Sequence, residues 1–165
     1  MKPIGVFYAT REGHTRRIAE HAAETLRVRG LDAEVRDLRN QADGIALKNY
    51  SGILLAASVH GEKHEPEMTE FVKSHRSELD IMPAAFLSVT LSEAGAERPN
   101  TTAQEHAQFV ADVQKVMDVF SAETAWPPKH AKPIAGALLY TKYNVLMRFI
   151  MKRIAKKSGG DNRAV

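Results

Sequence analysis

The chain has 165 residues, of which 44% are hydrophobic and 26% charged, as expected for one globular domain that buries a substantial core. It contains no cysteine, which excludes disulfides, thiolate metal ligands and cysteine nucleophiles. The net charge of +3 is too small to indicate nucleic-acid binding, and no apolar window approaches the ~20 residues of a membrane span. Because a strand-like run begins at once, we expect no signal peptide.

Apolar runs of strand length alternate with helical patterns along the chain. The predicted strands lie at Ile4–Tyr8, Ala33–Leu38, Gly52–Ala57, Ala84–Val89 and Pro133–Leu138. The predicted helices run from His14 to Arg29, begin at Pro66 and after Thr102, and run from Lys142 to Lys157. Gly30 stands where a glycine would end the first helix, and the second strand is expected at a sheet edge. This alternation predicts an α/β doubly wound parallel sheet of five strands.

The segment from Val6 to Thr15 passes from an apolar strand through a short polar turn into a helix. The free N–H groups and the dipole of a helix N-terminus attract an anion. Thr10 and Thr15 add hydroxyl donors, and Gly13 lets the backbone come close to a ligand. The segment alone is equally compatible with a phosphate site and with an ordinary helix start.

In an open parallel sheet, ligands bind beyond the carboxyl ends of the strands, where the strand order reverses. With the order 2-1-3-4-5, the loops after the first, third and fourth strands converge at that edge. These loops are Thr10–Thr15, Ser58–His64 and Thr90–Thr102. Their convergence favours the phosphate site over the ordinary helix start.

Several motifs together resemble one known family. Thr10-x-x-Gly13-x-Thr15 after a first strand resembles the FMN phosphate loop of flavodoxins. It is accompanied by Ala57-Ser58-Val59-His60, Ser88-Val89-Thr90-Leu91-Ser92, and the stretch Ile134–Tyr140 followed by Tyr143, Arg148–Lys152 and Ser158-Gly159-Gly160. From residue 2 to about 161, the chain is similar to the flavodoxin-type, quinone-dependent protoporphyrinogen oxidase family of haem biosynthesis.

The resemblance implies a flavodoxin-like fold, bound FMN, and oxidation of protoporphyrinogen IX to protoporphyrin IX with electrons passed to a membrane quinone. It implies a cytoplasmic protein on the inner face of the membrane, with no nucleic-acid partner. His60 is the catalytic candidate. The expected FMN contacts are Thr10, Arg11, Glu12, Gly13, His14, Thr15, Ser58, Val59, His60, Gly61, Ser88, Val89, Thr90 and Leu91. The expected contacts with substrate or membrane are Tyr140, Tyr143, Arg148 and Lys152.

Two features depart from the family pattern. Family members tend to carry His-x-Gly-Lys-His in the second loop, whereas this chain reads His60-Gly61-Glu62-Lys63-His64. We expect Glu62 to oppose an anionic reduced flavin. The chain also stops at Val165, before the final amphipathic helix of the family. We expect the apolar face left by that helix to be covered by the Lys142–Lys157 helix or by another chain in a homo-oligomer.

His60 and His64 are four residues apart in a loop and admit three interpretations: exposed side chains, metal ligands, or contacts with flavin or porphyrin. No further ligand set is evident, so we predict no metal site.

The Lys142–Lys157 helix carries an apolar stripe beside a basic face. It is interpreted as a core helix with a solvated face or as a helix on an anionic membrane, and its cations can also bind substrate carboxylates. We therefore divide the chain into an FMN-binding domain (1–140), an appended basic helix (141–157) and a polar tail (158–165).

Three functions are weighed: an FMN-dependent protoporphyrinogen dehydrogenase, a soluble electron carrier of the flavodoxin type, and a truncated member that binds without catalysing. The basic net charge counts against a carrier, because a carrier that docks on basic partners should be acidic.

Overall fold

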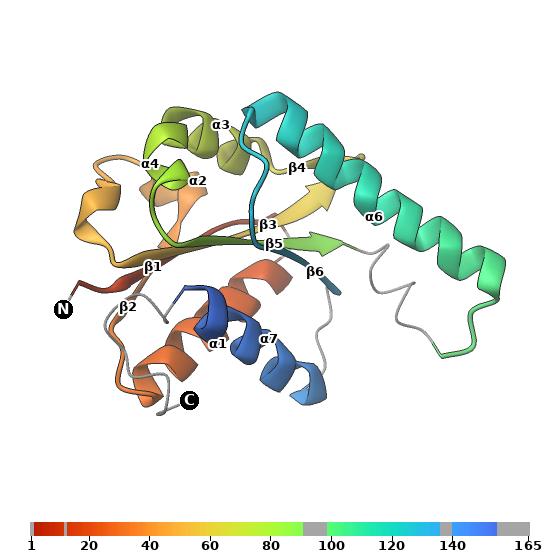
Figure 1. The fold of residues 1–165 in the computed structure, drawn as a ribbon, viewed down its shortest axis with the longest axis horizontal. Coiled ribbons are helices and arrows are strands. Elements are labelled where there is room, and N and C mark those ends of the chain that lie inside the picture. The colour runs from red at the N-terminus through yellow and green to blue at the C-terminus, as the bar shows by residue number, and fades with distance from the viewer. Residues whose placement is uncertain (1, 12, 91–98, 136–139, 155–165) are drawn as a thin grey trace.

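A mostly parallel sheet forms the middle layer of the molecule in the computed structural model, which describes residues 2–11, 13–90, 99–135 and 140–154 (Figure 1). Its long strands have the order β2-β1-β3-β5-β6, and a two-residue strand, β4, pairs antiparallel with the end of β3. The strands are β1 (Ile4–Ala9), β2 (Ala33–Asp37), β3 (Gly52–His60), β4 (Lys63–His64), β5 (Ala84–Thr90) and β6 (Ala131–Ala135). The predicted fold and order of the five long strands are confirmed, whereas β4 was not predicted.

Helices cover both faces of the sheet (Figure 1). One face carries α1 (His14–Val28) and α7 (Tyr140–Arg153). The other carries α2 (Leu38–Gln41), α3 (Pro66–Ser74), α4 (Arg76–Asp80) and α6 (Ala103–Thr124), with a 3₁₀ turn at Leu47–Asn49. The helix predicted from Pro66 is interrupted at His75, and the second half of the fifth predicted strand, residues 136–138, lies outside the described residues.

Strand β1 and residues 52–57 of β3 are apolar because both faces of the sheet are covered there. Every residue of β1 is buried, and its side chains alternate between two core clusters. Val6 and Tyr8 face α1 and α7, whereas Phe7 and Ala9 face α3 and α6. Strand β2 lies at the sheet edge, as predicted, and all its residues are half-buried.

Helix α1 ends at the glycine that the sequence marks. Gly30 has a φ of 89°, which only glycine adopts without strain. The Gly30 N–H donates to the Arg27 carbonyl and the Leu31 N–H to the Leu26 carbonyl, both at 3.0 Å. This pair of bonds is the Schellman arrangement, and it directs the chain into β2.

Helix α7 folds back onto the sheet beside α1, which is the first of the two arrangements expected for this face. Its apolar stripe is buried in the same cluster as Ile18 and Leu26 of α1, and consists of Leu146, Met147, Ile150 and Met151, with Ile154 following the helix. The stripe is therefore used by the core and is not available to another surface.

Gly52 provides a test of this packing, because a methyl group on Gly52 would overlap the Ile154 side chain. We expect Gly52→Ala to lower the free energy of unfolding by about 1–3 kcal/mol, since the end of α7 has to shift. In the double variant Gly52→Ala/Ile154→Ala, the combined loss should be smaller than the sum of the single losses. Urea denaturation measures both, and strictly additive losses would contradict the packing of α7 on β3.

Candidate functional site

The turn between β1 and α1 has the geometry of an anion site. Gly13 precedes the helix with a φ of 89°, and its N–H donates to the Thr10 hydroxyl at 3.3 Å. A Cβ atom at Gly13 would meet nothing within 4 Å, so the space beside the helix start is open. The first turn of α1 contains no acidic residue that would compete with an anion. The helix start therefore offers backbone donors to a ligand.

The hydroxyl of Thr15 is the feature of this turn that points most directly to a ligand. Its side chain is fully buried at the start of α1, and its hydroxyl has no hydrogen-bond partner among the described residues. A buried polar atom without a partner is costly, and each such atom calls for an explanation. A phosphate oxygen at the helix N-terminus would supply the missing bond, so these residues fit a phosphate group.

Glu65, which was not among the predicted site residues, links the loop after β3 to this turn. The Glu65 carboxylate is 1% exposed and pairs with the Arg11 guanidinium at 2.9 Å. It also accepts from the Ser58 hydroxyl at 3.0 Å and lies 3.3 Å from His60 Nε2. Three predicted site residues from two loops thus meet at one carboxylate.

Gly61 and Glu62, where the second loop differs from the family pattern, form a tight hairpin turn between β3 and β4. Gly61 and Glu62 have φ values of 55° and 69°, which places both in the left-handed region. Glu62 points to α6, where its carboxylate pairs with the Lys115 ammonium at 3.4 Å. This pairing offsets the negative charge that the sequence suggested would oppose a reduced flavin.

His64 is buried, so its interpretation as an exposed loop histidine is wrong. Its side chain is 5% exposed, and the ring contacts the edges of Phe86 and Phe120. Its Nε2 lies 2.8 Å from the Ser88 hydroxyl, while Nδ1 has no partner among the described residues. Burial lowers the pKa of His64 to about 4, although Glu123 acts in the opposite direction. His64 is therefore neutral at pH 7 and has a structural role beneath the site.

The structure places the remaining loop residues at the carboxyl edge in different ways. Thr10, Gly13, His14 and Thr15 gather at the start of α1, and Val59 and Gly61 belong to the β3–β4 hairpin. The Ser88 hydroxyl is directed to His64, and Val89 and Thr90 are buried at the end of β5. Glu12 and Leu91 lie outside the described residues.

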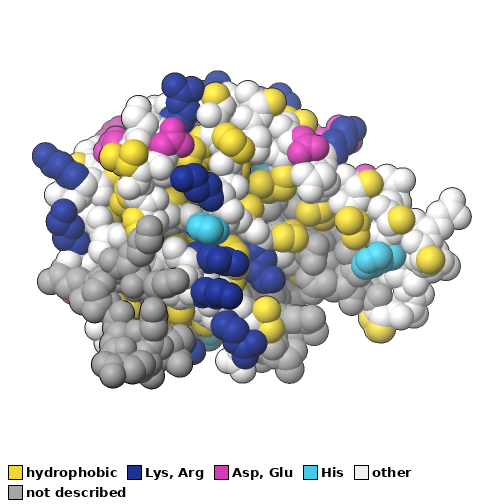
Figure 2. Space-filling view, in the orientation of Figure 1, with side chains coloured by type: hydrophobic (Ala, Val, Ile, Leu, Met, Phe, Trp, Pro, Cys, Tyr) yellow, Lys and Arg dark blue, Asp and Glu magenta, His cyan; other side chains and the backbone are white. Residues whose placement is uncertain are grey.

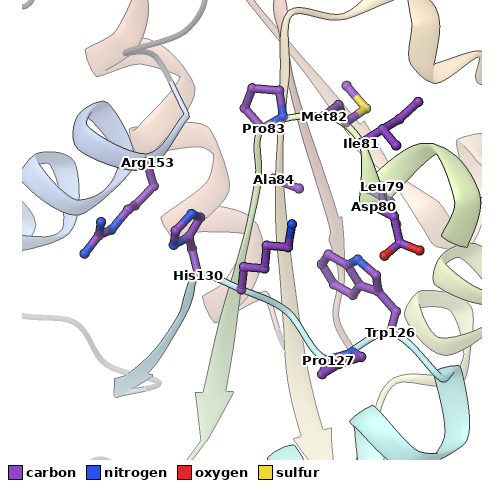
Figure 3. A pocket seen from close by; sticks show the side chains of 11 residues that line it. Leu79, Asp80, Ile81, Met82, Pro83, Ala84, Trp126, Pro127, His130 and Arg153 are labelled. Carbon is purple, nitrogen blue, oxygen red and sulfur yellow. The ribbon is translucent and has the colours of Figure 1, made fainter.

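The predicted contacts on α7 are not all at this edge. Arg148 and Lys152 are exposed, and the described side chains do not include Tyr140 and Tyr143. Helix α7 runs from the carboxyl edge to the amino edge, where Arg153 lines a cavity of about 270 Å³ with Ala84, Trp126 and His130 (Figure 3). Lys152 is therefore brought to the edge opposite the three loops, and this cavity is separate from them.

Sequence reasoning missed Glu65 and the buried state of His64. A partial signal was present for Glu65, since Pro66 at the first helical position marks the residue before it as the N-cap, where glutamate is not among the preferred residues. Its side chain does not cap its own helix, however, and reaches partners up to 54 residues away in sequence. In the part of the chain that the structure describes, no group of three His, Cys, Asp or Glu side chains is placed to hold a metal ion.

Comparisons with known proteins agree with this fold. The sequence profile of the flavodoxin domain matches residues 5–164. A flavodoxin from Pseudomonas aeruginosa superposes with a TM-score of 0.58 at 15% identity, over 95% of this chain and 99% of that one. The rubredoxin:oxygen oxidoreductase of Desulfovibrio gigas gives a TM-score of 0.62 at 13% identity, over 95% of this chain and 37% of that one. The protein is thus of the flavodoxin type.

Two relatives define the family more narrowly. Protoporphyrinogen IX dehydrogenase (quinone) of Escherichia coli strain K12 is 31% identical over 156 residues, which cover 94% of this chain and 80% of that protein. The protein of the same name from Leishmania major is 29% identical over 160 residues, covering 94% and 63%. The chain belongs to the protoporphyrinogen IX dehydrogenase (quinone) family and is an oxidoreductase. The resemblance found in the motifs is confirmed.

The buried, neutral His64 predicts a dependence of stability on pH. In the unfolded chain a histidine titrates near ~6.5, so between that pH and about 4 the unfolded state binds more protons than the folded state. The stabilisation is complete above pH 6.5 and is lost as the pH falls toward 4, by up to ~3 kcal/mol. We expect His64→Phe, which cannot titrate, to flatten the decline of unfolding free energy between pH 7 and 4.5.

Urea denaturation at several pH values measures this decline. Val72→Ala, at a buried position on α3 that does not titrate, is the control for a general loss of stability and should keep the wild-type pH dependence. An identical decline in the His64 variant and the wild type would show that His64 does not carry the effect.

Proposed function

We propose that the protein binds FMN at the loops after β1, β3 and β5 and oxidises protoporphyrinogen IX to protoporphyrin IX, passing the electrons to a membrane quinone. The observation that carries this proposal is the match, over 94% of the chain, to relatives named Protoporphyrinogen IX dehydrogenase (quinone). The flavodoxin domain match supports a flavin cofactor.

The phosphate of FMN would be held at the start of α1. The Thr15 hydroxyl lacks a partner among the described residues, and the backbone N–H groups of His14 and Thr15 belong to the first turn of the helix, whereas the Gly13 N–H is bonded to the Thr10 hydroxyl. Arg11 is bonded to Glu65, so its guanidinium is engaged beside β3. Backbone N–H groups and the Thr15 hydroxyl would therefore provide most of the phosphate binding. The Thr10 hydroxyl stabilises the turn by accepting from the Gly13 N–H.

The flavin ring would lie over the ends of β3 and β5, where the hairpin and Thr90 border the site. Bound FMN supplies a hydride acceptor. The chain's own residues would orient the substrate against that acceptor and accept the protons that the substrate loses. His60, at the end of β3 and 39% exposed, would receive a proton from the substrate at its imidazole.

Charge and similarity favour an enzyme over a carrier. The chain has a net charge of +3, whereas a carrier that docks on basic partners should be acidic. The relatives at 29–31% identity are named as dehydrogenases. A member without catalytic activity is the other alternative, and flavin binding separates it from the first two.

The decisive experiment combines an absorbance spectrum with a fluorescence assay. We expect the purified protein with FMN to show a bound-flavin spectrum, and porphyrin fluorescence to rise when protoporphyrinogen IX and menadione are both added under nitrogen. Because the electrons need an acceptor, fluorescence should not rise without the quinone. A protein that is colourless after incubation with FMN and removal of the unbound flavin would contradict both redox functions, and bound flavin without porphyrin formation would favour the carrier.

Thr15→Val provides the matched test of the phosphate site. Removing a hydrogen bond to a charged group should raise the FMN dissociation constant by about 10-fold or more. The apoprotein should not become less stable, because the hydroxyl has no partner among the described residues. Thr25→Val on the same helix removes a hydroxyl that is bonded to the His21 carbonyl and should leave FMN affinity unchanged. Equal affinities in both variants would place the phosphate elsewhere.

A location on the inner face of the cytoplasmic membrane is part of this proposal, and the basic face of α7 supports it. Lys and Arg side chains gather over α7 and the start of β6 (Figure 2). Arg148, Lys152 and Arg153 are exposed there, while the apolar stripe is buried in the core. Among the described residues, no helix combines the length and apolarity needed to cross a bilayer. Contact would therefore be electrostatic and would not require insertion.

Reversal of these three charges tests the membrane contact. Each cation near an anionic surface contributes roughly 1 kcal/mol, so Arg148→Glu/Lys152→Glu/Arg153→Glu should weaken binding to phosphatidylserine vesicles by about 100-fold or more. Lys48→Glu/Lys73→Glu/Arg76→Glu makes the same charge change on exposed residues elsewhere and should bind nearly as wild type. Vesicle sedimentation measures both. Equal wild-type binding to neutral phosphatidylcholine vesicles would contradict an electrostatic contact.

A further inference from the structure

The cavity of about 270 Å³ at the amino edge of the sheet has no part in the function proposed above (Figure 3). It is bordered by the segment that leaves α6, by the starts of β5 and β6, and by the ends of α4 and α7. It shares no lining residue with the cavity of about 330 Å³ beside the β3–β4 hairpin. Its volume is near the lower end of the range for small-molecule sites, so any ligand has to be small.

Trp126 lines this cavity, and the turn that ends α6 fixes its position. Ala125 has a φ of 55°, so the chain changes direction sharply as the helix ends. The Trp126 N–H donates to the Thr124 hydroxyl at 3.2 Å, and that hydroxyl donates to the Phe120 carbonyl at 2.8 Å. Trp126 is 4% exposed and Leu79, on the same cavity, is 3% exposed. The apolar part of the cavity is therefore already formed in the folded protein.

Two cations border the same cavity from separate elements. Lys129 lies two residues before β6, and Arg153 is the last residue of α7, at the end of the cavity opposite Trp126 (Figure 3). Both side chains are exposed, and neither forms an ion pair with a described residue. The backbone next to Lys129 is anchored to β5, because the His130 carbonyl accepts from the Phe86 N–H at 2.8 Å.

The charges around the cavity favour an anion. Its described lining includes one acid, Asp80, which lies on the Trp126 side and away from Arg153 (Figure 3). Two cations without a protein partner therefore face one exposed acid. Lysine and arginine bind carboxylate and phosphate groups through charge-assisted hydrogen bonds, and an aromatic side chain offers flat apolar surface to a ring.

We propose that this cavity binds a small organic anion that carries an apolar, ring-sized body. The anionic group lies between Lys129 and Arg153, and the apolar body packs toward Trp126. The site is distinct from the flavin site and does not depend on the proposed reaction. A protein that proves inactive toward protoporphyrinogen IX would therefore leave this inference unaffected.

The first test uses the only tryptophan of the chain as the reporter. In ¹⁵N-labelled protein, the single indole N–H signal should shift and saturate as 3-phenylpropionate is added, with a dissociation constant of about 1 mM or lower. The neutral 3-phenylpropionamide lacks the charge and acetate lacks the ring, so each should bind about 10-fold or more weakly. Saturating FMN should not displace 3-phenylpropionate, because the two sites lie at opposite edges of the sheet.

The second test changes the charges of the cavity. Lys129→Gln/Arg153→Gln should weaken the binding of 3-phenylpropionate by about 10-fold or more, because it removes both charged donors. Asp80→Asn should tighten binding by about 2-fold, because it removes a repulsive charge. Lys48→Gln/Lys73→Gln makes the same change of charge on exposed residues outside the cavity and should bind as the wild type.

Four results would overturn the inference. They are an indole signal that does not move with 3-phenylpropionate, equal binding of the acid and its amide, wild-type affinity in the Lys129→Gln/Arg153→Gln variant, and displacement of 3-phenylpropionate by FMN. The last result would place the anion in the flavin site. The backbone signals of the same spectra show whether each variant is folded, so a loss of binding is not confused with unfolding.

Discussion

The parallel pairing of β1 with β3 is the constraint on which the site depends. Their register runs from Ile4 opposite Gly52 to Ala9 opposite Ala57, so β1 ends beside Ala57 while β3 continues to His60. The strand order reverses at this pair, because β2 lies beyond β1 on one side and β5 beyond β3 on the other. The crossover helices α1 and α3 therefore leave to opposite faces of the sheet. A cavity of about 330 Å³ at this edge is bordered by Arg11 of the first loop, by the hairpin residues His60 and Lys63, and by Glu65.

The features that could be predicted from the sequence are those determined by local chemistry. Continuous apolar runs in β1, β3 and β5 indicate strands covered on both faces, and the structure agrees. Gly30 ends α1 because a residue with positive φ is needed there, which is a property of neighbouring residues. The turn from Thr10 to Thr15 was also predictable in shape, since strand, glycine and helix start are adjacent in the chain.

The features that were not predicted depend on contacts between distant segments. Strand β4 has only two residues, and it forms because Gly61 and Glu62 adopt the left-handed conformation of a tight turn. No hydrophobic pattern in the sequence indicates such a turn. His64 is buried because Phe86 and Phe120, from a strand and a helix far along the chain, close around it. The charges of Arg11 and Glu65 are separated by 54 residues and become one ion pair only in the folded chain.

The double use of α7 has a thermodynamic consequence for any contact made through its basic face. One side of the helix is fixed by the buried side chains from Leu146 to Ile150, while Arg148 remains in solvent between them. The helix is already ordered before a partner arrives, so association does not incur the entropy cost of folding a disordered segment. The domain would then bind to and dissociate from an anionic partner as a rigid body. A change of ionic strength alone would shift the equilibrium between the bound and the free protein.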